Sequence, residues 1–423
     1  MKTVCALGFF VVAFLTLLFV RQSPLEQVDI VVNPYGVSPL SAICEITSSR
    51  PVRVERAVIE GVRTQGYSTE LSRYHSIQLV GLTPGTLTVR LELVDEKGRR
   101  VYCPETEVSV APLPEDLPTI RVLHSEPEWT GYLYCQVEGP SKAYQLLLSP
   151  LGEIVWMRAR QPAEVLSLWL SQGRVLSLDL RRRLVETEEL TGRRLASNIF
   201  PSVVLDQKTT RLESPSRAWG VQGDVLVSLD LAGGSMQQIS VYSLLGVHPS
   251  KTGPAWLPEN SLVFSPELVA EVNPSARRVE WLAGDPARLH PALLPYCLEA
   301  EGGLYPHAPL ASLWAQNRAL LFVEQEQEFF LREYVVHLNE RKITRDWSYP
   351  IRTGRKVGSV LLCESFQPGR IGLAVNQTDG TGRASVRLQM VTQQSAPKLL
   401  LDVQIDGPEG WSVVSFQVVE SLF

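Results

Sequence analysis

Hydrophobic and polar residues alternate along several short stretches between residues 27 and 112. Leu87–Val94 is the clearest example, and Val52–Ile59 shows the same period in part. A period of two places alternate side chains on opposite faces of a β-strand. Asp95–Gly98 is typical of a hairpin turn, and Arg99–Tyr102 begins a return strand. Strands of this length, separated by Gly and Pro turns, predict a small β-sandwich over residues 27–112.

A second pattern, a turn followed by a short apolar strand, recurs after residue 119. The interval between units is roughly 35 to 60 residues, which suits four-stranded propeller blades. Val279–Leu282 and Ile343–Tyr349 each contain a tryptophan, which we interpret as packing between blades. We therefore predict a β-propeller over residues 119–423, with six blades as the expected number. The units begin at Gly152, Gly173, Gly223, Asn260, Asn317 and Gly369.

The predicted fold class is all-β, a small N-terminal β-sandwich followed by a β-propeller. The proline-rich stretch Ala111–Pro118 separates the two patterns and marks the domain boundary. Long amphipathic helices are scarce in the sequence.

The first 26 residues are predicted to be a signal anchor or transmembrane segment. Thr3–Val20 is an apolar run without a charge, flanked by Lys2 and Arg21. Its length suits a signal peptide or a short membrane helix. The bulky residues Leu17–Val20 lack the small side chains of a cleavage site, so we expect an uncleaved anchor. Lys2 should stay in the cytoplasm, with the rest of the chain exported.

Composition narrows the candidate partners. The formal net charge of −5 gives no electrostatic case for nucleic acid. The six cysteines form no CxxC or Cys/His cluster, and phosphate-binding or dinucleotide motifs are missing, so we expect no metal and no cofactor. In an exported chain, Cys44 with Cys103 is the first disulfide to test, because both lie in the predicted sandwich. The glycosylation sequon at Asn376 is interpreted as accidental.

Several motifs resemble those of one known family. The run Asn33–Ala42, NPYGVSPLSA, and the turn Gly81–Thr86 are similar to its N-terminal domain. Pro306–Pro309, with the strand Asn317–Phe322, resembles the block that carries its catalytic histidine, and Trp347–Pro350 resembles the neighbouring strand. The family is the bacterial arylsulfate sulfotransferases, and the motifs spread over most of the chain after residue 30. The resemblance implies an exported six-bladed propeller with a small N-terminal β-domain, so we expect the chain in the periplasm, anchored to the inner membrane by its N-terminal segment.

The resemblance also implies a reaction, the transfer of a sulfuryl group between phenols through a covalent sulfohistidine, without a nucleotide donor. His307 falls on the nucleophile position of the family. His248 falls near a second family histidine, which we expect to act as the acid/base partner. A neutral imidazole can attack sulfur, and a proton donor assists the departing phenoxide. The implied partners are a phenolic sulfate donor and a phenol acceptor, and a homodimer is a further expectation.

Three family positions differ in this chain. Ser250 replaces an asparagine, Phe264–Glu267 has no arginine, and Glu164–Ser167 has no histidine. Because the sulfuryl oxygens need fixed positive groups or hydrogen-bond donors, these losses slow transfer unless other residues, such as Arg318 or Arg332, substitute. The sequence leaves two functions open: a sulfotransferase, or a catalytically degenerate propeller that serves as a binding or scaffold module at the cell envelope.

Overall fold

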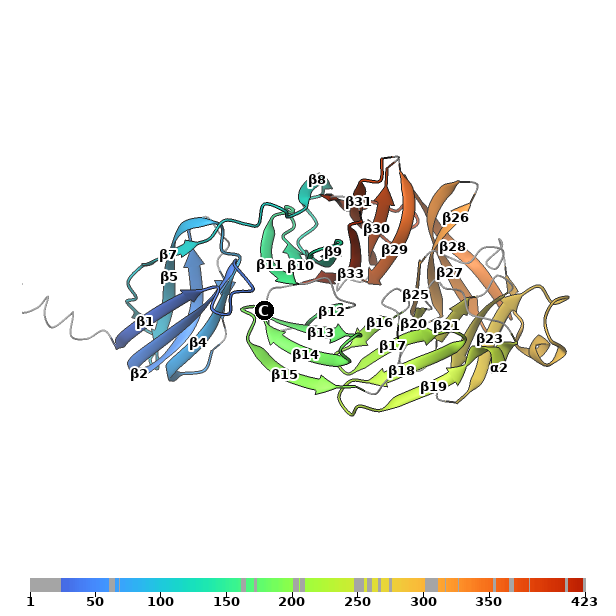
Figure 1. Ribbon diagram of the computed structural model, residues 1–423, viewed down its shortest axis with the longest axis horizontal. Helices are drawn as coiled ribbons and strands as arrows, with labels where there is room; N and C mark the ends of the chain where they lie inside the picture. The colour runs from blue at the N-terminus through green and yellow to red at the C-terminus, as the bar shows by residue number, and fades with distance from the viewer. Residues whose placement is uncertain are drawn as a thin grey trace, which may run out of the picture. The chain divides into compact units, whose positions relative to one another are not determined.

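The fold is seen in a computed structural model (Figure 1). Regular structure in its described part is almost entirely β-strand, which confirms the all-β prediction. The chain divides into two compact units, Met1–Glu115 with Leu190–Gly192, and Asp116–Glu189 with Arg193–Phe423. The structure describes residues 24–60, 65–67, 69–160, 165–170, 173–200, 205, 210–246, 255–256, 261–264, 268–273, 276–300, 311–315, 317–325, 327–352, 355–364, 369–379, 381–407 and 410–420.

The first unit is built around one long strand, β2 (Ser41–Ile59). Its first half pairs with β1 and β4, and its second half pairs with β3 and β5, so β2 joins two groups of antiparallel strands. Leu87, Val89, Leu91 and Leu93 of β5 are buried, as the predicted period of two requires. The arrangement agrees with the small β-sandwich that was predicted. The other strands are β1 (Leu25–Val32), β3 (Gln65–Gly66), β4 (Ser72–Val80), β5 (Gly85–Asp95), β6 (Arg100–Val101) and β7 (Thr106–Val110).

The five described cysteines are free thiols, so the Cys44–Cys103 disulfide that was to be tested first is not formed in this structure. Cys44 is fully buried in β2, and Cys103 is also buried. Burial, followed by the charge of the Cys103 thiolate, raises the pKa of Cys44 to about 12. A thiol with such a pKa is chemically unreactive near neutral pH.

The second unit is a β-propeller, as predicted, and its described strands form six sheets. In the first three sheets, neighbouring strands are consecutive in the chain, except that the C-terminal strand β33 completes sheet 1. Sheet 1 contains β33 (Ser412–Val419), β9 (Tyr132–Glu138), β10 (Ala143–Leu148) and β11 (Ile154–Arg160); sheet 2 contains β12 (Val165–Leu170), β13 (Arg174–Asp179), β14 (Leu184–Glu189) and β15 (Arg194–Ile199); sheet 3 contains β16 (Arg211–Ser214), β17 (Arg217–Gln222), β18 (Val225–Asp230) and β19 (Met236–Ser240).

Sheets 4 to 6 follow, with two short helices, α2 (Val241–Leu245) and η1 (Pro291–Tyr296), before and after sheet 4. Sheet 4 has a very short inner strand, because β20 has 2 residues. Five sheets are therefore complete blades, and the predicted number of six is reached only when sheet 4 is counted. Sheet 4 contains β20 (Ala255–Trp256), β21 (Ser261–Phe264), β22 (Leu268–Asn273) and β23 (Arg278–Gly284); sheet 5 contains β25 (Ala311–Ala315), β26 (Arg318–Gln325), β27 (Glu328–His337), β28 (Lys342–Ile351) and β24 (Glu299–Ala300); sheet 6 contains β29 (Lys356–Glu364), β30 (Arg370–Thr378), β31 (Ala384–Thr392), β32 (Leu399–Gly407) and β8 (Thr119–Ser125).

The first strands of the sheets form the inner ring of the propeller. Strand β33 lies beside β12 and β29, β12 lies beside β16, and β25 lies beside β20 and β29. We call β33, β12, β16, β20, β25 and β29 the inner strands. Because β33 pairs with β9, residues from the two ends of the unit share sheet 1 and close the ring.

Apolar cores fill the spaces between neighbouring sheets. Trp281 packs with Leu321 between sheets 4 and 5, and Trp347 packs with Leu331 and Leu373 between sheets 5 and 6. Both indoles are buried, which confirms the predicted role of these tryptophans in blade packing.

The turns that introduced the repeated units lie mostly between an inner strand and the second strand of its sheet. Gly173, Asn317 and Gly369 hold such turns with φ of 63°, 64° and 73°, whereas Gly223, with φ of 63°, lies between the second and third strands of sheet 3. This left-handed backbone conformation favours glycine and, among other residues, asparagine. The sequence signal therefore marked the second strands of three sheets and the third strand of sheet 3.

Candidate functional site

His248 and His307, the two predicted site residues, lie outside the described residues. The strands that follow them in the chain are described, and they are β20, which begins at Ala255, and β25, which begins at Ala311. The predicted strand Asn317–Phe322 corresponds to β26, and the strand Ala311–Ala315, which was not predicted, pairs antiparallel with it and forms the inner strand of sheet 5.

The inner strands all begin at one face of the propeller, which we name the leading face. In an antiparallel sheet of four strands, the fourth strand ends where the first strand begins. The chain then passes to the inner strand of the next sheet at that same end. The beginnings of β20, β25 and β29 therefore lie on the leading face. Because β25 is adjacent to both β20 and β29, its beginning lies between the other two around the axis.

Three cationic residues occur between β28 and β29 at the leading face: Arg352 directly follows the fourth strand of sheet 5, and Arg355 and Lys356 stand at the beginning of β29. Arg352 and Lys356 are exposed, and the Arg352 carbonyl accepts a hydrogen bond from Arg387. Arg355 Nη1 lies 3.9 Å from a carboxylate oxygen of Asp406 on β32, which is too long for a strong ion pair. Lys356 is therefore the cation at the beginning of the inner strand beside β25. Sequence reasoning missed these three cations, although the basic run directly after the Trp347–Pro350 motif was a visible signal.

Arg318, considered as a substitute for the missing family arginine, is engaged elsewhere. Its Nη1 donates to Glu333 Oε1 at 3.0 Å, and its Nη2 lies 3.8 Å from Asp346. It begins β26, which starts at the end of sheet 5 where the antiparallel β25 finishes. Because Arg318 pairs with Ala315, it is about 14 Å along the sheet from the beginning of β25 at Ala311, the rise of four strand residues.

Arg332, the second substitute considered, also has partners within sheet 5. Its guanidinium donates to Gln325 and lies 4.7 Å from the centre of the Phe330 ring. This cation–π contact and the hydrogen bond hold Arg332 within its own blade.

Side chains hold the inner strands together around the closing strand β33. Gln417 accepts a hydrogen bond from the Trp169 N–H at 2.8 Å and donates to the Trp169 carbonyl at 3.3 Å. Ser415 accepts from the Ser167 N–H at 3.2 Å. Such bonds satisfy backbone N–H and C=O groups of an inner strand that have no partner in a neighbouring strand of the same sheet. They give the inner ring a fixed geometry, which a site on the leading face requires.

An ion pair fills the space between sheets 1 and 2. Arg158 and Arg160 both donate to the Glu188 carboxylate, with Arg158 Nη2–Oε1 at 2.8 Å and Arg160 Nη2–Oε2 at 2.9 Å. Burial alone acts to raise the pKa of Glu188, but the hydrogen bond and charge of Arg158 outweigh it, and the pKa is lowered. All three side chains are largely buried, so this cluster fixes two blades and offers no access to a ligand.

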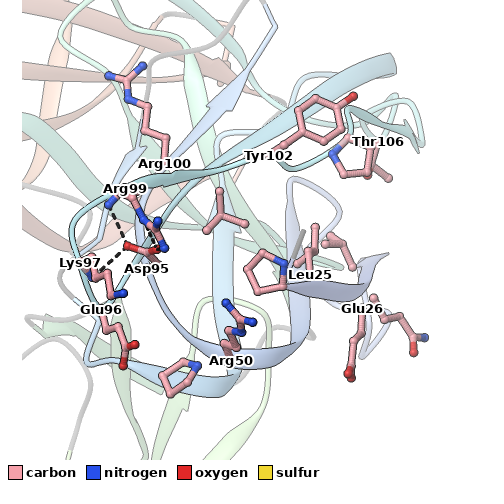
Figure 2. Close-up of a pocket in the computed structure, with 16 residues that line it drawn as sticks. Leu25, Glu26, Arg50, Asp95, Glu96, Lys97, Arg99, Arg100, Tyr102 and Thr106 are labelled. Carbon is pink, nitrogen blue, oxygen red and sulfur yellow. Dashed lines mark hydrogen bonds and ion pairs between the residues drawn. The ribbon is translucent and has the colours of Figure 1, made fainter. Parts of the chain in front are cut away.

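The first unit carries an open groove of about 1040 Å³ (Figure 2). Its walls come from the start of β1, the β2 bend at Arg50, and the hairpin of β5 and β6. Arg99 Nε donates to Asp95 Oδ2 at 2.8 Å, and this bond lowers the pKa of Asp95. Arg50, Lys97 and Arg100 are exposed around the groove. The sequence predicted strands and a hairpin turn in this region, and no site.

Two searches of the described part of the chain gave negative results. It contains no group of three or more His, Cys, Asp or Glu side chains placed to hold a metal ion. None of its helices has both the length and the apolar character needed to cross a membrane.

Comparisons with known proteins identify no family for this chain. No family model and no curated protein matches it. Many solved structures are similar to it, and the three given next have TM-scores too low to support any argument. They are a protein of unknown function from Bacteroides caccae (TM-score 0.40, 14% identity, covering 69% of this chain and 100% of that one), the WD40 domain of SCAP from fission yeast (0.31, 9%, 76% and 92%) and Sqt1 from Saccharomyces cerevisiae (0.33, 7%, 87% and 92%).

Proposed function

We propose that the protein transfers a sulfuryl group from one phenol to another, with His307 as the nucleophile and His248 as its acid/base partner. One observation carries this proposal beyond the sequence motifs. His248 occurs in the chain shortly before β20, His307 occurs shortly before β25, and these two inner strands are neighbours. Chain order thus brings both histidines into segments that lead to adjacent inner strands.

The proposed reaction has two steps. A neutral imidazole nitrogen of His307 attacks the sulfur of an aryl sulfate, the N–S bond forms, and the S–O bond to the phenol breaks. The departing phenoxide takes a proton from His248. An acceptor phenol then gives its proton to His248 and attacks the sulfur, which releases His307. Two steps with a covalent intermediate lower each barrier relative to direct transfer.

Binding of the sulfuryl oxygens is assigned to cations of the leading face. Lys356 begins β29, the inner strand beside β25, and Arg352 and Arg355 precede it in the connection from β28 on the leading face. Hydrogen bonds from guanidinium or ammonium groups to an oxyanion are charge-assisted and therefore strong. This supports the proposal despite the missing family arginine, because positive charge is supplied from the next sheet.

The chain is also proposed to work outside the cytoplasm, attached to the inner membrane through Thr3–Val20. That segment is apolar and lies between Lys2 and Arg21. Phenolic compounds partition into membranes, so an anchored enzyme would act where its substrates concentrate.

The test is a transfer assay with full-length protein, 4-nitrophenyl sulfate as donor and phenol as acceptor. The account predicts release of 4-nitrophenol together with formation of phenyl sulfate. The His307→Ala variant should lose both products. His290→Ala is the matched control, because His290 is exposed at the first turn of η1, and it should keep full activity.

A second function, a binding or scaffold module without catalysis, is favoured by one observation. Arg318 is held by Glu333 at the end of sheet 5 away from the leading face, so it does not replace the family arginine. Folded wild-type protein that binds 4-nitrophenyl sulfate but transfers nothing would support this second function over the first.

A further inference from the structure

The groove of the first unit lies directly beside the point where the described chain begins. Pro24, Leu25, Glu26, Gln27 and Val28 all line it. Only three residues, 21–23, separate Pro24 from the last residue of the apolar run at position 20. An extended chain covers at most about 3.5 Å per residue, so Pro24 is within about 14 Å of position 20. With the apolar run in a membrane, the groove stands at the headgroup layer.

Cations of the first unit are concentrated at this groove. The described residues between 24 and 115 include eight Lys or Arg and twelve Asp or Glu, so the unit as a whole is acidic. Four of the eight cations line the groove, against three of the twelve acids. Asp95 is bonded to Arg99, so the other charged residues that line the groove are the cations Arg50, Lys97 and Arg100 and the acids Glu26 and Glu96.

The groove also presents the side chain typical of a membrane interface. Tyr102 is 77% exposed at its rim (Figure 2), the largest exposed fraction among the described large hydrophobic side chains. Tyrosine is enriched where the headgroups meet the hydrocarbon, because its ring is apolar and its hydroxyl is polar. Guanidinium groups bind phosphate oxygens through paired N–H donors.

We propose that this groove binds the phosphate groups of anionic phospholipids in the membrane that holds Thr3–Val20. The proposal rests on the membrane attachment given under the proposed function, and it is independent of the sulfuryl transfer reaction. Arg50, Lys97 and Arg100 contact the headgroup phosphates, and Tyr102 enters the interface. Because Glu26 and Glu96 reduce the net positive charge of the groove, we expect the groove to contact only one or two headgroups. The first unit then docks on the membrane surface instead of swinging freely on its anchor.

Hydrogen exchange on full-length protein in vesicles tests this proposal. Amides of residues 95–106 should exchange more slowly in vesicles containing phosphatidylglycerol than in vesicles of phosphatidylcholine alone. The double variant Arg50→Gln/Arg100→Gln should lower the ratio of docked to undocked protein about 30-fold. The matched control is Arg73→Gln/Arg90→Gln, which removes two exposed arginines outside the groove and should keep the protection.

Three results would overturn the proposal. Equal exchange in both kinds of vesicle would show that anionic headgroups do not bind. Equal protection by 10 mM inorganic phosphate without vesicles would show a site for a free anion. Full-length protein that fails to float with vesicles would remove the anchor on which the proposal depends. The transfer assay is read separately on the same samples, so failure of the groove and failure of the proposed reaction are distinguishable.

Discussion

The side chain of Asn376 pairs with both backbone polar atoms of Val413. Its Oδ1 accepts from the Val413 N–H at 2.7 Å, and its Nδ2 donates to the Val413 carbonyl at 2.9 Å. Asn376 belongs to β30 of sheet 6, and Val413 belongs to the closing strand β33 of sheet 1. One amide thus joins the last sheet to the strand that closes the propeller.

Replacing Asn376 with alanine should destabilise the propeller by about 2–3 kcal/mol, because a buried N–H and a buried carbonyl lose their partners. Urea unfolding, followed by the tryptophan fluorescence of the second unit, measures this loss. Gln237→Ala is the control, since Gln237 is exposed on β19 and its truncation should cost less than about 0.5 kcal/mol. Equal stability of the Asn376→Ala and wild-type proteins would show that the pairing does not hold the ring closed.

The same residue shows what the sequence can and cannot predict. Asn376 was read as an accidental glycosylation sequon, and its burial agrees, because a buried amide in use as a donor cannot carry a glycan. Its structural role was invisible, since its partner Val413 is 37 positions away in sequence. Local patterns carry no information about contacts between distant strands.

Local structure was predictable wherever a short-range signal existed. The alternation in Leu87–Val94 identified β5, and the left-handed turn residues identified the second strands of three sheets. Inner strand β25 was missed, because its sequence, ASLWA, is short and does not alternate. The addition of β8 to sheet 6 and of β33 to sheet 1 was also missed, because both depend on partners at the other end of the unit.

Glu333 should make the propeller less stable as the pH rises. Its side chain is 1% exposed, and burial raises its pKa against the opposing charge of Arg318. An acid whose pKa is raised by folding holds its proton more tightly in the folded state. Its stabilising contribution is therefore complete below the unfolded pKa of about 4.5 and is lost as the pH rises through the folded pKa.

The Glu333→Gln variant, which cannot ionise, should lack this dependence. The wild-type protein should lose stability relative to the variant between pH 4 and pH 8, as measured by urea unfolding at both values. Glu340→Gln alters an exposed glutamate near the next turn and should follow the wild-type profile. If the free energy of unfolding of the wild-type protein instead rose relative to that of the Glu333→Gln variant as the pH increased, the raised pKa of Glu333 would be contradicted.

Cys44 should react very slowly with iodoacetamide in the folded protein. Its pKa of about 12, against an ordinary value of 9.0, lowers the thiolate fraction at pH 8 about 1000-fold. Mass spectrometry of labelled peptides should show the partly exposed Cys297 modified first and Cys44 modified only after unfolding. Protein isolated from the periplasm with Cys44 joined to Cys103 would instead show that export oxidises this pair.

His248→Ala should slow sulfuryl transfer most strongly for donors whose phenol is a poor leaving group. A general acid contributes about 100- to 10,000-fold when the departing oxygen needs a proton, and far less for a stable phenoxide. Rates with 4-nitrophenyl sulfate and phenyl sulfate, compared between the wild-type and variant proteins, measure the difference. An equal loss with both donors would assign His248 a role in binding.

The most direct measurement of the central claim is the search for a sulfuryl group on His307. Full-length protein is mixed briefly with ³⁵S-labelled 4-nitrophenyl sulfate, without acceptor. It is then digested under alkaline conditions, which preserve the acid-labile N–S bond of sulfohistidine. The account predicts an acid-labile label on the peptide that contains His307, which disappears when phenol is added and is never formed by His307→Ala. Sulfuryl transfer with no label on that peptide, or transfer that survives His307→Ala unchanged, would contradict the proposed mechanism.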